Sequence, residues 1–378
     1  MRGILHFVTP FYPRKSGLGN YVMGLCKNLP KDYEISVVCC DTENTKQYFE
    51  VYNNIKIYRV KTISFFNRLY FLPNPLHLVE TLKNVSKNDY FLVHTHTRFF
   101  MTSLVGLVFA KIKNIPVAHI EHGSSFVQNN NRLVWLLSRI YDFSLGRLVL
   151  SKSDYIFCVS RNVSEFVKKL GKRSDVFILP NGVDTKRFRK IGNTKKIKTE
   201  LNLNKSGVFI SYIGRLIEGK GVQDLIKAVE PIDGICLIIA GDGPYRGNLE
   251  KISQINGRIV FLGEIDTDKV IKLLSITEIF VNPSHTEGMP TSILEAGSVG
   301  CACIATNVGG TSEIIESGKN SFLIEKEDIL TLREKINLLL LNKRMRKNFS
   351  IRLKSKIRDC FEWKRITDKY LAYLEGIQ

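Results

Sequence analysis

The chain has 378 residues, of which 44% are hydrophobic, and it carries a formal net charge of +19. At roughly 100–200 residues per domain, this length predicts two domains, and the composition is ordinary for folded proteins. No stretch approaches the roughly 18 consecutive apolar residues of a membrane span, and the first residues lack the pattern of a signal peptide. We therefore expect a cytoplasmic protein. Peripheral attachment to the inner face of the cell membrane is compatible with this location.

The positive charge is concentrated in the first half, where residues 1–190 hold 28 Lys and Arg against 13 Asp and Glu, a net +15. A basic surface suits nucleic acid, an anionic membrane or phosphorylated substrates, and a solvated lysine-rich surface is the alternative. No nucleic-acid recognition motif accompanies the charge, so we expect no nucleic-acid partner. The eight cysteines include no CxxC pair, and we expect no metal site.

Short apolar runs alternate with helical patterns along the whole chain, which is typical of βαβ units and parallel sheets. The strands predicted in the first half are Gly3–Thr9, Ile35–Cys40, Ile55–Val60, Tyr90–Thr95, Pro116–Ile120, Tyr155–Val159 and Val176–Leu179. The turn cluster Pro180–Asp184 ends this half. A charged stretch, Thr185–Lys205, follows, and we expect it to contribute little to a core.

The same alternation of predicted strands and helices is found in the second half. The strands predicted there are Val208–Ile213, Ile235–Ala240, Ile259–Leu262, Ile279–Val281 and Ala302–Thr306. Helices are predicted to begin near Gly221, Tyr245, Thr267, Thr291 and Thr311, and the chain from Glu327 onward is predicted to be helical and basic. The pattern predicts an α/β protein of two Rossmann-like, doubly wound parallel sheets facing a cleft, with domains at 1–184 and 185–360.

Two cations follow the first predicted strand of the second half. Arg215 and Lys220 lie in the segment Gly214–Gly221, directly after Val208–Ile213 and at the start of a helix. An Arg fork, a Lys charge and a helix N-terminus together suit a diphosphate. The segment nearly fits a P-loop, but Gly221 stands where the Mg²⁺-binding Ser or Thr would be, so an ATPase is disfavoured.

Two carboxylates follow a later strand of the same predicted sheet. Glu287 lies in the loop after Ile279–Val281, and Glu295 lies on the next helix. Carboxylates can accept hydrogen bonds from sugar hydroxyls, and backbone N–H groups at a helix start suit phosphate and sugar oxygens. The candidate residues between the two carboxylates are Gly288, Met289, Pro290, Thr291 and Ser292. A helix cap at Glu287 and a solvated Glu295 are the alternative, and the two nearby cations favour a ligand site.

A loop with two glycines follows the first predicted strand. Gly17 and Gly19 precede a helix, so this loop could wrap a phosphate. An NAD-binding fingerprint is disfavoured, because seven residues separate Thr9 from Gly17. A dinucleotide motif places its first glycine almost immediately after the strand.

Histidines end two predicted strands of the first half. His122 precedes Gly123 after the strand Pro116–Ile120, which would place it at the mouth of the predicted cleft. A lone histidine is often structural, but this position at a carboxyl end favours a functional role. His94 and His96 close an earlier strand with weaker support for a function.

Taken together, these motifs resemble the family four retaining glycosyltransferases, which have the two-domain GT-B fold. The matching pieces are Pro-Asn-Gly-Val-Asp at 180–184, Gly-Arg-Leu-x-x-x-Lys-Gly at 214–221, Gly-Asp-Gly-Pro at 241–244, Glu-Gly-x-Pro with a second Glu at 287–295, and Val-Gly-Gly-Thr-x-Glu at 308–313. Each piece is moderately specific, and their order and spacing cover nearly the whole chain. Phe361–Trp363 resembles the start of the family's last helix, so the helix 361–378 is expected to cross back onto the N-terminal domain.

The resemblance implies roles for the candidate residues of the second half. Arg215 and Lys220 would neutralise the donor diphosphate as it leaves, and Glu295 would hold the ribose. Glu287 and the amides after it would grip the transferred sugar. The implied enzyme is retaining, hexosyltransferase-like and metal-independent, and it uses a nucleotide-sugar as substrate with no cofactor.

For the first half, the resemblance implies that His122 reaches the donor sugar from the other domain. Gly17 and Gly19 would give the phosphates room. The acceptor, a glycan or a lipid-linked molecule of polysaccharide, glycolipid or glycoprotein assembly, would lie mainly on this half. Two alternatives share the fold: a catalytically inactive sugar-nucleotide-binding protein and a sugar-nucleotide epimerase.

The segment Arg132–Lys152 adds one further expectation. It is amphipathic, with Leu133, Trp135, Leu136 and Leu137 among arginines. Such a segment can lie on an anionic bilayer or pack as a core helix, and the sequence leaves both interpretations open.

Overall fold

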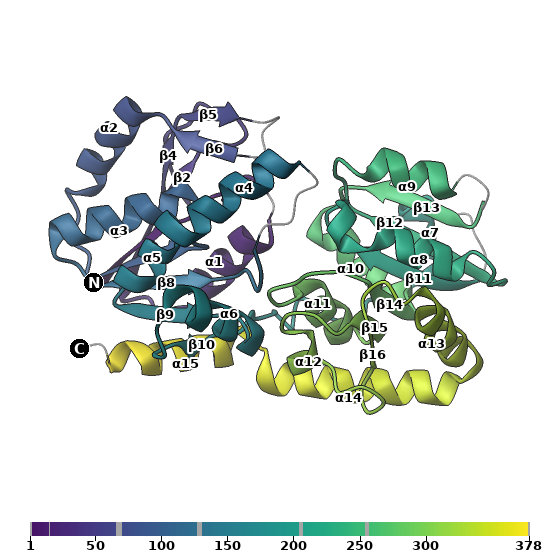
Figure 1. Ribbon diagram of the computed structural model, residues 1–378. Coiled ribbons are helices and arrows are strands. Elements are labelled where there is room, and N and C mark those ends of the chain that lie inside the picture. Colours follow the sequence, from purple (N-terminus) through teal and green to yellow (C-terminus); the bar gives the residue numbers. More distant parts are fainter. Residues whose placement is uncertain are drawn as a thin grey trace. The chain divides into compact units, whose positions relative to one another are not determined.

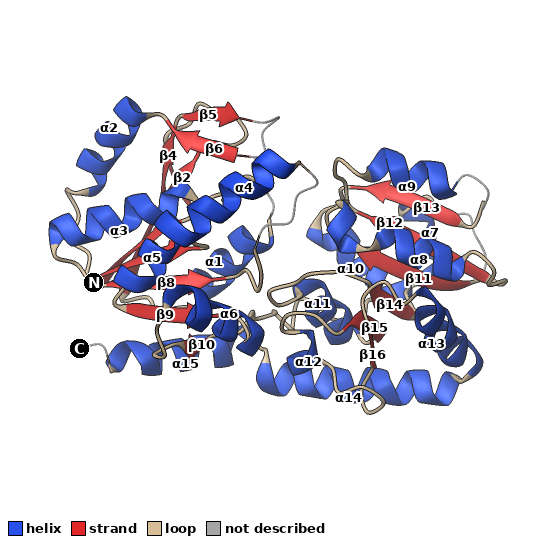
Figure 2. Cartoon of the chain, in the orientation of Figure 1, coloured by secondary structure: helices blue, strands red, loops and turns tan. Residues whose placement is uncertain are grey.

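The computed structural model describes residues 2–14, 16–65, 70–126, 131–203, 207–253 and 257–376. The chain forms two compact units, unit 1 from residues 1–180 with 366–378 and unit 2 from residues 181–365. In each unit helices pack against one mainly parallel sheet (Figures 1 and 2). The predicted pair of parallel-sheet α/β units is therefore confirmed.

The main sheet of unit 1 has eight strands in the order β10-β9-β8-β7-β1-β2-β4-β3, and only the edge pair β3–β4 is antiparallel. A separate antiparallel pair is formed by β5 and β6. The strands are β1 (Arg2–Phe7), β2 (Tyr33–Cys40), β3 (Phe49–Tyr52), β4 (Ile55–Val60), β5 (Thr62–Phe65), β6 (Tyr70–Pro73), β7 (Leu92–His96), β8 (Val117–Glu121), β9 (Tyr155–Cys158) and β10 (Phe177–Ile178).

Helices cover this sheet, and a π-helical turn at Asp142–Gly146 joins two of them. The helices are α1 (Gly17–Asn28), α2 (Pro75–Val85), α3 (Met101–Lys113), α4 (Arg132–Tyr141), α5 (Arg147–Lys152), α6 (Arg161–Gly171) and the last helix, α15 (Trp363–Glu375). Because side chains alternate along a strand, Leu5 and Phe7 of β1 join the apolar cluster with Leu107 of α3. His6, between them, points to the opposite face and contacts Cys26 of α1.

The sheet of unit 2 has six parallel strands in the order β13-β12-β11-β14-β15-β16. They are β11 (Val208–Ile213), β12 (Ile235–Ala240), β13 (Ile259–Gly263), β14 (Ile279–Asn282), β15 (Ala302–Thr306) and β16 (Phe322–Ile324). The helices are α7 (Thr194–Glu200), α8 (Val222–Val229), α9 (Arg246–Ser253), α10 (Thr267–Ile276), α11 (Thr291–Val299), α12 (Thr311–Ile314), α13 (Ile329–Leu341) and α14 (Lys343–Cys360). Across the described residues of both units, no helix is long and apolar enough to cross a membrane.

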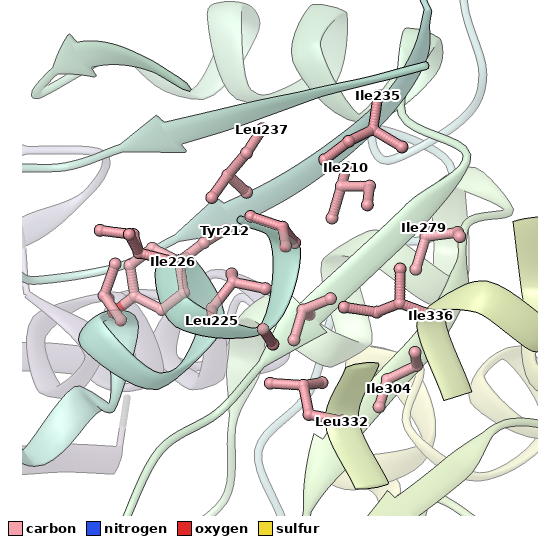
Figure 3. Packing of buried hydrophobic residues seen from close by; sticks show 14 of the residues in the cluster. Ile210, Tyr212, Leu225, Ile226, Ile235, Leu237, Ile279, Ile304, Leu332 and Ile336 are labelled. Carbon is pink, nitrogen blue, oxygen red and sulfur yellow. The ribbon is translucent and has the colours of Figure 1, made fainter. Parts of the chain in front are cut away.

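Both faces of the unit 2 sheet are buried. Ile210, Ile235 and Leu237 pack with residues of α8 and α13 on one face (Figure 3). Their strand neighbours Phe209 and Cys236 pack with α7 and α10 on the other face. The near-continuous apolar runs of β11 and β12 follow from this double burial.

Two sequence-based expectations need correction. The stretch Thr185–Lys205 does contribute to a core, because Ile197, Leu201 and Leu203 are buried against the unit 2 sheet; its last two residues lie outside the described ones. Four strands were not predicted, namely β3, β5, β6 and β16. These strands have only three or four residues, too few to show a clear alternation of apolar and polar side chains.

The chain passes from one unit to the other twice, near residues 180 and 365, and the two connecting segments are hydrogen-bonded to each other within unit 2. The N–H of Val183 donates to the carbonyl of Phe361 at 2.8 Å, and the N–H of Trp363 donates back to Val183 at 3.2 Å. Gly182 lies against the Trp363 ring, where an added Cβ would come within 2.5 Å of a ring carbon. The predicted turn cluster at 180–184 thus pairs with the segment that leads into α15.

Candidate functional site

In unit 2, a cation and a carboxylate from two loops form an ion pair. Lys220 lies between β11 and α8, and Glu287 lies between β14 and α11; β11 and β14 are neighbours in the sheet. Lys220 Nζ is 2.6 Å from Glu287 Oε1. The Ser284 hydroxyl donates to the same carboxylate oxygen at 2.7 Å. Adjacent strands therefore place two of the predicted site residues together at the carboxyl edge of the sheet.

Glycines around Lys220 allow the two loops to touch. Gly221 has a φ of +65°, and a Cβ there would lie 2.0 Å from the carbonyl oxygen of Pro283. The carbonyl of Gly219 accepts the N–H of His285 at 2.9 Å. His285 Nε2 in turn lies 2.7 Å from the carboxylate of Asp224 on α8, a second link between the loops that the sequence did not indicate.

Arg215 is exposed, and the backbone around it is held by contacts with Tyr212 and with the loop at Gly241. The buried Tyr212 hydroxyl donates to the Arg215 carbonyl at 3.2 Å. A Cβ at Gly241 would lie 1.9 Å from the Gly214 oxygen, and a Cβ at Gly243 would lie 2.2 Å from the Leu216 oxygen. The Gly-Asp-Gly-Pro piece, a weak signal when read alone, packs directly beneath the Arg215 loop.

The segment from Gly288 to Ser292 leads into α11 and is held by two other loops. Gly310 donates its N–H to the Gly288 carbonyl at 2.7 Å. The Met289 side chain is buried, and its carbonyl accepts the Asn181 side-chain amide at 2.8 Å. Pro290 precedes the first residue of α11, Thr291 is half-buried, and the Ser292 hydroxyl lies 3.4 Å from the Asn282 amide nitrogen.

Glu295 lies on α11 and is half-buried. Burial raises the pKa of its carboxyl to about 7, and the nearby Arg187 guanidinium opposes this rise. Glu295 is thus partly protonated near neutral pH. Its electrostatic partner Arg187, in the segment after the 180–184 turn, was not among the predicted site residues.

In unit 1, the start of α1 and the end of β8 come together. Gly17 opens α1, and a Cβ at this position would meet nothing within 4 Å. Gly19 donates its N–H to the Ser16 hydroxyl at 2.9 Å, which caps the helix. The Tyr21 ring stands edge-on to the half-buried His122 ring, with centroids 4.8 Å apart.

A buried ionic network holds the backbone at His122. Glu121 Oε1 accepts the N–H groups of His122 at 3.0 Å and Gly123 at 2.9 Å. Arg98 Nη1 lies 3.3 Å from the same oxygen, and Arg98 Nε donates to Asp142 at 2.9 Å. Burial opposes ionisation, yet the Arg98 charge and the contact with His119 keep the pKa of the Glu121 carboxyl far below its ordinary value.

The predicted site residues therefore fall into two groups, one in each unit. Seven of the eight cysteines are buried, and Cys360 is exposed. Within the described ranges, no group of three or more His, Cys, Asp or Glu side chains could hold a metal ion.

The Lys220 loop gives a matched test of its packing. Gly221→Ala should lower the free energy of unfolding by more than about 1–2 kcal/mol, the cost of a left-handed non-glycine residue, because the new Cβ also meets Pro283. Gly219→Ala, with nothing within 4 Å of the new Cβ, should be nearly neutral. Urea unfolding measures both, and equal midpoints would contradict the close approach of the loops.

Two protein families match the chain, and together they cover most of it. The family described as Glycosyl transferases group 1 matches residues 193–356, which lie in unit 2. The family described as Glycosyltransferase Family 4 matches residues 15–187. The Lys220–Glu287 pair lies in the first match and His122 in the second.

Two solved structures show the similarity of the fold. Sucrose-phosphate synthase (tll1590) from Thermosynechococcus elongatus superposes with a TM-score of 0.84 at 19% identity, covering 100% of this chain and 99% of that one. Anabaena Alr3699/HepE in complex with UDP-glucose gives 0.82 at 16% identity, with 100% of both chains covered. These likenesses confirm the predicted GT-B fold.

Two proteins of similar sequence have names that state a glycosyltransferase. The "Uncharacterized glycosyltransferase MJ1069" of Methanocaldococcus jannaschii is 30% identical over 394 residues, and the match covers 100% of both proteins. The UDP-Gal:alpha-D-GlcNAc-diphosphoundecaprenol alpha-1,3-galactosyltransferase of Escherichia coli is 25% identical over 336 residues, 84% of this chain and 83% of that protein. The chain therefore belongs to the group 1 glycosyltransferases.

Proposed function

We propose that the chain is a retaining, metal-independent glycosyltransferase that moves a sugar from a nucleotide-sugar to a glycan or lipid-linked acceptor in polysaccharide, glycolipid or glycoprotein glycan assembly. The observation that carries this proposal is the Lys220–Glu287 pair, with Arg215 on the same loop as Lys220. Cations at a sheet edge suit a diphosphate, and carboxylates suit sugar hydroxyls. An inactive sugar-nucleotide-binding protein could keep Arg215 while losing catalysis, and the intact pair of carboxylates, Glu287 and Glu295, argues against that alternative.

The proposed donor is a UDP-sugar. The name of the E. coli relative specifies UDP-Gal, and the Anabaena protein was solved with UDP-glucose. In this proposal Glu295 accepts hydrogen bonds from the ribose hydroxyls, and Glu287 with the 288–292 segment binds the transferred sugar. His122 donates to a sugar oxygen, and Gly17 and Gly19 leave room for the phosphates.

The proposed chemistry places positive charge where negative charge develops. As the bond between the anomeric carbon and the phosphate oxygen breaks, charge builds on the diphosphate, and fixed Arg215 and Lys220 charges stabilise it more than in the ground state. The acceptor hydroxyl attacks from the same face, forms the new bond to the anomeric carbon and passes its proton to the departing phosphate oxygen. This route retains the anomeric configuration without a protein nucleophile.

Replacement of Lys220 tests this role. Lys220→Ala should lower kcat by about a hundred- to a thousandfold, the usual loss when one preorganised electrostatic donor is removed. Turnover is measured as sugar transfer from the nucleotide-sugar to the acceptor, with product analysis in a second reaction that lacks acceptor. Epimerised donor in that second reaction would identify an epimerase instead.

The matched control is Lys227→Ala, an exposed lysine on α8 in the same unit. It should leave both turnover and Tm unchanged. Lys220→Ala should also keep the Tm of the unaltered protein within a few degrees. Full turnover in Lys220→Ala would remove this lysine from the mechanism.

The carboxyl of Glu295 makes donor binding depend on pH. With its pKa raised to about 7 by burial, the carboxylate fraction grows from about a tenth at pH 6 to about nine-tenths at pH 8. The ionised group offers acceptors on both oxygens, whereas protonation turns one oxygen into a donor and weakens acceptance from the two ribose hydroxyls. The Kd of the nucleotide-sugar should therefore fall about tenfold over this range.

A thermal-shift panel of UDP-, GDP- and ADP-sugars first identifies the stabilising donor, because a ligand stabilises the state that it binds. Titration calorimetry at pH 6, 7 and 8 then gives the Kd. Nucleotide-sugars are the right probes, since their diphosphate does not titrate in this range. Glu295→Gln should bind weakly at every pH, and a steep pH dependence in that variant would assign the effect to another group.

The proposed location on an anionic membrane rests on α4 and the residues that follow it. Large apolar side chains are exposed along this stretch: Leu133, Trp135, Leu136, Leu137, Ile140, Phe143 and Leu148. Arg132, Arg139 and Arg147 lie among them, and residues 1–190 carry a net +15. An exposed apolar helix face flanked by cations suits the interface of an anionic bilayer, where a lipid-linked acceptor would be found.

Vesicle binding tests the location. The protein should pellet with phosphatidylglycerol vesicles at low salt, much less at high salt, and the fluorescence of Trp135 should shift to the blue. Leu136→Ser with Leu137→Ser should abolish pelleting, whereas Leu341→Ser, an 87% exposed leucine of unit 2, should not. Absence of pelleting at low salt would reject the membrane location.

A further inference from the structure

The face of the unit 1 sheet that meets α1 and α15 carries buried imidazoles. β1 and β7 are paired in register, with His6 opposite His94. His6 is 1% exposed, and His94 and His96 are fully buried. Because side chains alternate, Leu5, Phe7 and Val93 of the same strands lie in the apolar cluster on the other face. Histidine is only moderately often buried, so three on one face of a core call for an explanation.

Three of the four imidazoles in this region form a line that ends at His122. His6 Nδ1 lies 3.0 Å from His96 Nε2, and His96 Nδ1 lies 3.5 Å from His122 Nε2. At the inner end, His6 Nε2 lies 3.7 Å from the sulfur of Cys26. His94 stacks on His6 with centroids 4.8 Å apart, but its Nε2 contacts the Tyr370 hydroxyl at 2.6 Å instead.

The rings of this line are neutral at physiological pH. Burial lowers the pKa of His6 to about 3 and that of His122 to about 4, where Glu121 opposes and His119 assists the shift. Burial and the neighbouring histidines also hold the pKa of His96 well below its ordinary value. A neutral imidazole has one N–H and one acceptor nitrogen, so each ring-to-ring contact needs a donor on one side and an acceptor on the other.

The tautomers along the line are therefore coupled, and Cys26 sets their direction. Burial raises the pKa of the Cys26 thiol, which stays protonated. A thiol sulfur is a weak acceptor, whereas an imidazole nitrogen is a good one, so S–H donation to His6 Nε2 is the better arrangement. His6 Nδ1–H then donates to His96 Nε2, and His96 Nδ1–H donates to His122 Nε2.

We infer that His6 and His96 are positioning residues that hold the His122 ring as its Nδ1–H tautomer, so that its free N–H can donate to an oxygen of the substrate. The contacts of the line are given by the geometry, and only its effect on turnover rests on the proposed function. In this arrangement His122 is a hydrogen-bond donor with a fixed orientation and not a proton shuttle.

The tautomers can be read without any ligand. Long-range ¹H–¹⁵N spectra of the full chain, labelled at its seven histidines, distinguish protonated from unprotonated ring nitrogens. Single substitutions assign each signal. At pH 7.5, His6, His96 and His122 should all be Nδ1–H tautomers, and an Nε2–H tautomer at His122 would overturn the inference.

Substitutions at the inner end and in the middle of the line give the decisive comparison. Cys26→Ala should release His122 into a mixture of tautomers, and Cys26→Ser, which keeps a donor, should preserve Nδ1–H. His96→Leu should also produce the mixture, whereas His94→Leu, equally buried on the same strand but outside the line, should leave the His122 signal unchanged. An unchanged His122 signal in both Cys26→Ala and His96→Leu would sink the inference.

Measurements of turnover distinguish a failure of this inference from a failure of the proposed function. His96→Leu should lower kcat by about tenfold, roughly one hydrogen bond, with the KM for the nucleotide-sugar within about twofold, and His96→Gln should recover part of the loss. If the tautomer of His122 changes while kcat does not, the line of imidazoles is real and the role proposed for His122 in transfer is wrong.

Discussion

Neighbouring parallel strands end at the same edge of a sheet, and this constraint places the charged groups of unit 2. Lys220 and Glu287 are 67 residues apart in the chain, yet they follow the paired strands β11 and β14 and meet at 2.6 Å. Glycines make the meeting possible, because Gly221 sits beneath the carbonyl of Pro283 and Gly309 beneath that of Glu287. The loop at Gly241 approaches its neighbour equally closely, because a Cβ there would lie 1.9 Å from the Gly214 oxygen.

The two units expose these ionisable groups to different degrees. In unit 2 the Lys220–Glu287 pair is partly exposed, at 25% of the lysine side chain and 12% of the glutamate side chain. In unit 1 the histidines of β1 and β7 are buried, and burial keeps them neutral. The ionic network of Arg98, Glu121 and Asp142 is also buried. Unit 1 thus encloses both charged and neutral groups, each with a partner inside the unit, whereas the pair in unit 2 keeps contact with solvent.

Much of the fold could be predicted from the sequence, because strands buried on both faces, such as β11 and β12, read as continuous apolar runs. The helix α7 could not, since Ile197 and Leu201 are hidden among lysines, and β16 is too short for any periodicity. The positions of Lys220 and Glu287 after two strands of one sheet were predicted in the same way, whereas the pairing of those two strands was not. The His6–His96–His122 line and the partnership of Arg187 with Glu295 were not, because each joins segments whose proximity depends on tertiary packing.

The paired crossings at Val183 and Phe361 bear on how this chain can be divided for experiments. A fragment confined to residues 185–360 would omit both segments of that pairing, together with the contact between Gly182 and the Trp363 ring, and it would leave the Met289 carbonyl without the Asn181 amide. A truncation before α15 would also take Tyr370 away from His94. Expression of the second unit by itself is therefore best designed on residues 181–365, with both connecting segments included.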